Sequence, residues 1–157
     1  MMDVAVAFPS VSRGCLLRKM RDMDIDKNLV EWVDSFMRGR KVVLCVDGQE
    51  GEVREVTTGL PQGSPVSPIL FAIYMADIQE EVENQVEGCR GISFMDDITW
   101  VAEGEDMMDL TEKLGRCAER SLRWAEGNAV RFETSKTEAV LLTKRKRLWR
   151  KKKRRPI

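Results

Sequence analysis

Residues 91 to 102 read Gly91-Ile-Ser-Phe-Met-Asp-Asp-Ile-Thr-Trp-Val-Ala102, and they are the most informative segment for the fold. Two halves rich in β-branched and aromatic residues meet at Asp96-Asp97, which predicts an antiparallel hairpin with two carboxylates at or beside its turn. Adjacent acids at a hairpin tip are most often ordinary turn residues. Because two like charges held together cost free energy unless a cation compensates them, a divalent metal ion is the alternative interpretation.

Helices and strands alternate on both sides of this hairpin. Apolar periodicity, capping residues and turn residues predict the following elements: a strand at 2–8, helices after Ser12 and Asp26, strands at 41–47 and 52–57 around Asp47-Gly48, a helix from 69 to about 86, a helix at 110–127, and strands at 129–133 and 138–143. The stretch 58–68 holds three prolines and two glycines, so it is predicted to be an ordered loop. The order predicts an α+β fold, an antiparallel sheet with helices packed on one face.

Composition excludes several classes of protein. With 157 residues and 43% hydrophobic content, the chain has material for one compact domain. It contains no histidine, which excludes Ser/His and Cys/His triads and histidine-based zinc sites. No apolar run is long enough for a membrane helix, and we expect no membrane association. The four cysteines lie far apart, so we expect reduced, mostly buried thiols.

The net charge of zero conceals an uneven distribution. Ten of the 26 basic residues lie in one terminal stretch: Lys144, Arg145, Lys146, Arg147, Arg150, Lys151, Lys152, Lys153, Arg154 and Arg155. The body before the tail holds the remaining 16 basic residues and 26 acidic residues, so its net charge is −10. The tail could contact nucleic-acid phosphates, act as a nuclear-import signal, or have no selected role.

Asp3 is a second unusual acid, because aspartate is disfavoured in a strand such as Asp3-Val-Ala-Val-Ala-Phe8. Paired with Asp96 across neighbouring strands, it would supply oxygen ligands to two Mg²⁺ ions about 3.5–4 Å apart. In the loop, Gln62 offers donor and acceptor atoms to a base or sugar, although a rigid surface loop would have the same composition.

Four blocks in order resemble the reverse transcriptases of non-LTR, LINE-like retrotransposons. They are Asp3-Val-Ala-Val-Ala-Phe8, Leu60-Pro-Gln-Gly63 with Ser64-Pro-Val-Ser-Pro68, Phe94-Met-Asp-Asp97, and Phe132-Glu-Thr-Ser-Lys-Thr-Glu138. The resemblance covers about residues 2 to 143, and the combination is far more specific than any single block. It implies the palm of an RNA-directed DNA polymerase.

The resemblance also implies roles for individual residues. Asp3, Asp96 and Asp97 would be catalytic metal ligands for two Mg²⁺ ions, with Mn²⁺ as an alternative ion. Phe8 would be the steric gate against a ribose 2′-hydroxyl, although an ordinary core phenylalanine would look the same. Gln62 and Gly63 would contact the incoming nucleotide and template base. Lys136 would assist departing pyrophosphate, with a surface lysine as the alternative.

Two departures from the family are visible. Pro9 stands where family members usually carry an acid. We also expect the fingers and thumb regions to lie outside this chain, in adjacent sequence, so that residues 1–143 form a partial palm and 144–157 a basic tail. The resemblance implies an RNA template, a DNA primer and deoxynucleotides as partners, with little or no activity from this chain alone.

Two alternatives stay open. One is an inactive retroelement remnant that binds nucleic acid through its tail. The other is the palm of an RNA-synthesising polymerase, which the bulk of Phe8 disfavours. Localisation rests on the tail alone, which makes a nuclear location one option.

Overall fold

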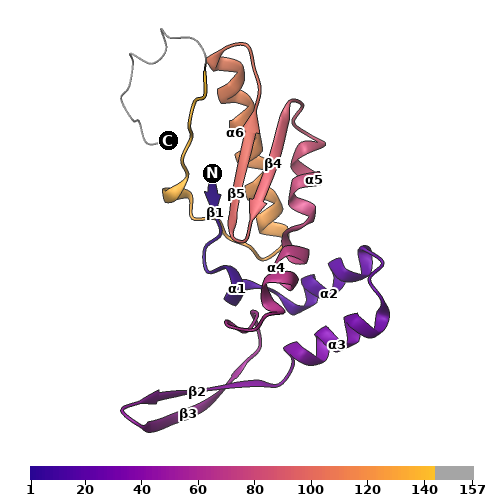
Figure 1. Cartoon of the computed structure of the whole chain (residues 1–157), viewed down its shortest axis with the longest axis vertical. Coiled ribbons are helices and arrows are strands. Elements are labelled where there is room, and N and C mark those ends of the chain that lie inside the picture. The colour runs from indigo at the N-terminus through magenta and orange to yellow at the C-terminus, as the bar shows by residue number, and fades with distance from the viewer. Residues whose placement is uncertain (144–157) are drawn as a thin grey trace.

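The hairpin at Asp96-Asp97 forms as the sequence predicts. In the computed structural model, which describes residues 1–143, β4 (Cys89–Phe94) pairs antiparallel with β5 (Asp97–Ala102), and Phe94 lies opposite Asp97 at the turn. The short strand β1 (Met2–Asp3) pairs antiparallel with the other edge of β5, giving the order β1-β5-β4 (Figure 1). The chain's first residues and its later hairpin therefore build one sheet.

Helices cover one face of this sheet, as predicted. Along β5, Ile98 and Trp100 are buried while Asp97 and Thr99 are only half-buried, the alternation of a strand with one covered face. Helix α5 (Asp77–Glu83) packs on β4, and helix α6 (Met107–Gly127) packs on α5, β4 and β5 (Figure 1). The α+β architecture with helices on one face is confirmed.

The predicted helix caps and the second hairpin are also present. Ser12 caps α2 (Arg13–Asp22) by accepting from the Cys15 amide, and Asp26 caps α3 (Lys27–Met37) by accepting from the Asn28 amide. Strands β2 (Arg40–Val46) and β3 (Gln49–Val56) form a two-stranded ribbon that projects away from the sheet (Figure 1).

The prediction of a strand at 2–8 is wrong beyond residue 3. Val4 makes only an isolated bridge to Phe132, Val6 has a left-handed φ of 53°, and residues Ala7–Ser10 form a short helix, α1. The carbonyl of Phe8 instead accepts from the Leu60 amide at 2.8 Å, so the chain here bonds to the 58–63 loop and not to a strand. Pro9, which lacks an amide hydrogen, fits the first turn of a helix.

The predicted strand pair at 129–133 and 138–143 does not form. The segment has a three-residue 3-10 helix, η1 (Thr134–Lys136), and its amides bond to the amino-terminal residues instead. The Glu133 amide donates to the Asp3 carbonyl at 2.8 Å, and the Glu138 amide donates to the Met1 carbonyl at 3.2 Å. In Figure 1 this segment passes beside β1, so its partner is the start of the chain.

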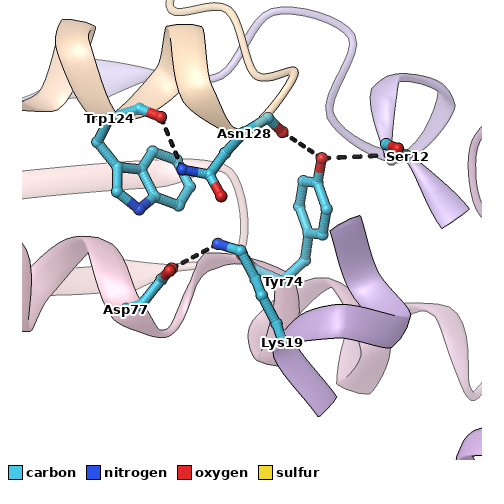
Figure 2. Close-up of polar contacts among 6 residues, drawn as sticks. All are labelled: Ser12, Lys19, Tyr74, Asp77, Trp124 and Asn128. Atoms are coloured by element: carbon cyan, nitrogen blue, oxygen red, sulfur yellow. Dashed lines mark hydrogen bonds and ion pairs between the residues drawn. The ribbon is translucent and has the colours of Figure 1, made fainter. Parts of the chain in front are cut away.

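The predicted helix at 69–86 is divided into α4 (Ser67–Met75) and α5. At the junction, the Lys19 ammonium donates to the Tyr74 carbonyl at 2.8 Å, and a side-chain donor inserted into the helical hydrogen-bond ladder is a common cause of a break. Figure 2 shows Lys19 reaching this junction from α2 and meeting Asp77 at 2.5 Å.

The remaining expectations have mixed outcomes. Cys89 and Cys117 are buried as expected, but Cys15 is half-buried and Cys45 is exposed; all four are free thiols. The predicted basic tail, 144–157, lies outside the described residues. Within residues 1–143, we find no helix with both the length and the apolar character needed to cross a bilayer.

Candidate active site

Strand pairing brings Asp3 and Asp97 together. They are register partners across β1 and β5, and residues directly opposite one another in a sheet point to the same face. The next pair, Met2 and Ile98, is buried beneath the sheet. Asp3 and Asp97 therefore share the face that the helices leave open.

Asp96 lies at the same place, in the turn between β4 and β5. Its carbonyl accepts from the Val4 amide at 3.0 Å, which fixes the turn to the residue after Asp3. The preceding residue, Met95, has a left-handed φ of 53°, a strained conformation for a side chain of its size. The side chain of Asp96 is exposed, so it is accessible to a ligand.

Lys136 approaches these acids from η1. Its ammonium donates to the Asp3 carboxylate at 2.9 Å, and this hydrogen bond and the negative charge of Asp3 raise the pKa of Lys136 above the ordinary value. The charges of Glu133 and Asp96 raise this pKa further. The structure thus joins three of the residues expected from sequence, Asp3, Asp96 and Lys136, in one electrostatic cluster.

The carboxylates do not by themselves form a ready metal site. Among residues 1–143, no group of three Asp, Glu or Cys side chains is arranged to hold an ion. The donor chemistry suits Mg²⁺, since all the candidate ligands are carboxylate oxygens, on β1, β5 and the turn between β4 and β5. In the structure, however, the cation that touches Asp3 is the ammonium of Lys136.

Phe8 and the 58–63 loop lie against one another. The Phe8 ring packs edge-on against Phe71 of α4 with centroids 5.4 Å apart, so it is in part a core residue. Gly59 has a φ of 80°, and a Cβ there would come within 2.7 Å of the Pro9 Cα. Only glycine fits this close approach, which holds the loop against α1.

Gln62 and Gly63, further along this loop, are exposed. The loop is closed by Ser67, whose hydroxyl donates to the Pro61 carbonyl at 2.6 Å. In the part of the chain that the structure describes, no hydrogen bond joins Gln62 to the three acids. The structure brings the loop to Phe8 but gives it no direct contact with the carboxylates.

Sequence reasoning missed the role of Tyr74. Figure 2 shows its buried hydroxyl donating to the Asn128 carbonyl and accepting from the Ser12 amide, the latter at 3.3 Å. These bonds connect the segment that follows Phe8 with the segment that leads to Lys136. The apolar periodicity placed Tyr74 on the buried face, but no local pattern pointed to Asn128.

Lys19, beside Tyr74, was also missed. It is 4% exposed, and its ammonium lies 4.4 Å from the centre of the Trp124 ring. Burial lowers the pKa of Lys19, and the hydrogen bond and charge of Asp77 only partly offset that effect. A lysine in a helix is normally a surface residue, so no local pattern indicated the burial of Lys19.

Comparison with known proteins identifies the family. Residues 1–155 match the family described as reverse transcriptase (RNA-dependent DNA polymerase). The chain belongs to this reverse transcriptase family. Enzymes of this family are nucleotidyltransferases that use a divalent metal ion and a nucleic-acid template and primer.

The similar reverse transcriptases come from retrotransposons. The RNA-directed DNA polymerase from mobile element jockey of Drosophila funebris is 29% identical over 145 residues, covering 90% of this chain and 16% of that protein. Its Drosophila melanogaster counterpart is 25% identical over 147 residues, with 92% and 16% covered. The Pol polyprotein from type-1 retrotransposable element R2 of Popillia japonica is 27% identical over 105 residues, covering 62% of this chain and 17% of that protein.

These relatives confirm the resemblance to non-LTR retrotransposon enzymes. The chain spans about a sixth of the length of the curated reverse transcriptases it matches.

Proposed function

We propose that residues 1–143 are the palm portion of an RNA-directed DNA polymerase, which adds deoxynucleotides to a primer 3′-hydroxyl along an RNA template. One observation carries the proposal: Asp3 lies opposite Asp97 on the open face of the sheet, with the Asp96 turn bonded to the amide of Val4. Acids from two distant parts of the sequence lie together in the fold. Acids that serve only as turn residues need no acidic partner on another strand.

Asp3, Asp96 and Asp97 are the proposed ligands of two Mg²⁺ ions, or of Mn²⁺. Ions held there would favour deprotonation of the primer hydroxyl and neutralise charge on the triphosphate. The chain's own contribution is to hold the acids on a rigid sheet, since Asp3 and Asp97 are fixed by strand pairing. The ammonium of Lys136 would neutralise or protonate the departing pyrophosphate.

Phe8, Gln62 and Gly63 are the proposed nucleotide-contacting residues. The edge-on packing of Phe8 against Phe71 limits the movement of its ring, and a fixed ring can exclude a ribose 2′-hydroxyl by size. Gln62 and Gly63 are exposed on a loop that is anchored at both ends, through Gly59 and Ser67. An anchored loop can present the Gln62 amide group to a base at a defined position.

A second candidate function is nucleic-acid binding without catalysis. The concentration of ten basic residues between Lys144 and Arg155 favours it, because such a run binds phosphates without sequence preference. Binding of this kind weakens steeply as the salt concentration rises, and it would not depend on Asp96.

Primer extension separates the two functions. The wild-type chain and an Asp96→Ala form are compared at high enzyme concentration on a primed RNA template. We expect little extension from the wild type and none from the variant, because Asp96 is a proposed metal ligand. Equal signals from the two proteins, including none from either, would remove the proposal that this chain polymerises by itself.

A further inference from the structure

The ammonium of Lys136 lies 2.9 Å from Oδ2 of Asp3, one of the oxygens proposed to bind a metal ion. We propose that Lys136 is the counter-cation of Asp3 in the ion-free protein, and that a divalent ion must displace it. The inference rests on the proposed function, because it assumes that Asp3 is a metal ligand. It adds a role for Lys136 before any nucleotide binds.

The backbone holds Lys136 close to Asp3. The Glu133 amide donates to the Asp3 carbonyl at 2.8 Å, and the Lys136 amide donates to the Glu133 carbonyl at 3.1 Å. The Glu138 amide, on the other side of η1, donates to the Met1 carbonyl. The 3-10 helix is therefore attached to β1 on both sides, and this attachment keeps Lys136 near the carboxylate.

Asp3 and Lys136 differ in exposure, and this difference permits a metal ion to replace the ammonium. The Asp3 side chain is 23% exposed, whereas the Lys136 side chain is 66% exposed. The carboxylate has lost part of its hydration and gains from a bound cation. The lysine can leave toward solvent without opening the core.

The negative charges of Asp3, Glu133 and Asp96 all act on Lys136, and the positive charge of Arg131 acts on Glu133. A divalent ion replaces one positive charge by two at this position, which favours the exchange. The released ammonium then becomes free to contact a phosphate. Ion binding and the availability of Lys136 are coupled events.

Mn²⁺ titration followed by electron paramagnetic resonance tests the competition. Removing the ammonium in Lys136→Gln should tighten Mn²⁺ binding about two- to five-fold, because the ion then no longer competes with an exposed ion pair. Lys136→Arg, which keeps the charge, should bind like the wild type. Lys113→Gln is the matched control, because Lys113 contacts Asp109 at the same 2.9 Å but on α6.

The Nζ signal of Lys136 in nitrogen-15 NMR gives an independent measurement during Mg²⁺ addition. In the wild type, the chemical shift of this signal should change with the same midpoint as ion binding. In Asp3→Asn it should not change. Unchanged Mn²⁺ affinity in Lys136→Gln, or a Lys136 signal that does not respond to Mg²⁺, would overturn this inference. An Asp3→Asn form that binds Mn²⁺ like the wild type would instead contradict the proposed metal site.

Discussion

Asp3 and Asp97 are cross-strand partners, although their residue numbers differ by 94. The first strand supplies only two residues to the sheet, yet it positions Asp3, and the next residue, Val4, fixes the Asp96 turn. The site therefore depends on a small number of contacts made by the amino-terminal segment. Several substitutions test whether those contacts have the proposed consequences.

Gly59→Ala should lower the free energy of unfolding by roughly 2–4 kcal/mol, because it adds a clash to a left-handed backbone. The new Cβ would come within 2.7 Å of the Pro9 Cα at a φ of 80°. Gly63→Ala is the control, with a φ of 85° but nothing within 4 Å of its Cβ, and should cost about 1–2 kcal/mol. Denaturant unfolding measures both, and equal losses would contradict the close packing of the loop on α1.

Tyr74→Phe should lower the free energy of unfolding by about 1–3 kcal/mol, because the buried Asn128 carbonyl loses its donor. Hydrogen exchange should also accelerate at the Ser12 amide, which donates to the same hydroxyl. Trp32→Phe, at an exposed position on α3, is the control and should change stability by less than about 0.5 kcal/mol. Unaltered exchange at Ser12 would show that the hydroxyl does not hold this segment.

Lys19→Met should change how stability depends on pH. Burial lowers the pKa of Lys19, so between that lowered pKa and 10.5 the unfolded chain binds more protons than the folded one. The wild type should therefore gain stability relative to Lys19→Met as pH rises toward 10. The neighbouring Asp77, Tyr74, Cys15 and Arg18 are present in both proteins, so the comparison isolates Lys19.

Denaturant unfolding of the two proteins at several values between pH 7 and 10 gives this difference. A difference in unfolding free energy between the two proteins that stays constant from pH 7 to 10 would contradict the lowered pKa of Lys19. A loss of wild-type stability relative to Lys19→Met as the pH rises would mean that Asp77 stabilises the ammonium more than burial destabilises it.

The sequence predicted those parts of the fold that local chemistry determines. Ser12 and Asp26 cap their helices, and the acids of Asp96-Asp97 sit at a hairpin turn, because capping and turn preferences act over a few residues. The wrong predictions concern segments whose structure depends on contacts with distant parts of the chain. Residues 129–143 have the composition of strands, but their amides bond to the first residues of the chain, a partner that no local pattern reveals.

In the candidate site, too, the local motifs were predicted and the tertiary contacts were not. The motif acids and Lys136 were found from sequence, and the structure places Asp3, Asp96 and Lys136 together. Their roles in binding ions and nucleotide stay predictions. The contact of Lys136 with Asp3 could not be foreseen, because it depends on how η1 is attached to β1. Tyr74 and Asn128 were missed for a similar reason, since 54 residues separate these hydrogen-bond partners.

Mn²⁺ binding by the wild type, Asp96→Asn and Asp47→Asn, followed by electron paramagnetic resonance, tests whether the Asp96 hairpin holds a cation. Asp47 is the matched control, because it is also an exposed aspartate at a β-hairpin turn and its left-handed φ of 51° suits asparagine. We predict that the wild type and Asp47→Asn bind Mn²⁺ equally and that Asp96→Asn loses most of the binding. An Asp96→Asn protein that titrates like the wild type would contradict the assignment of this hairpin as a cation site.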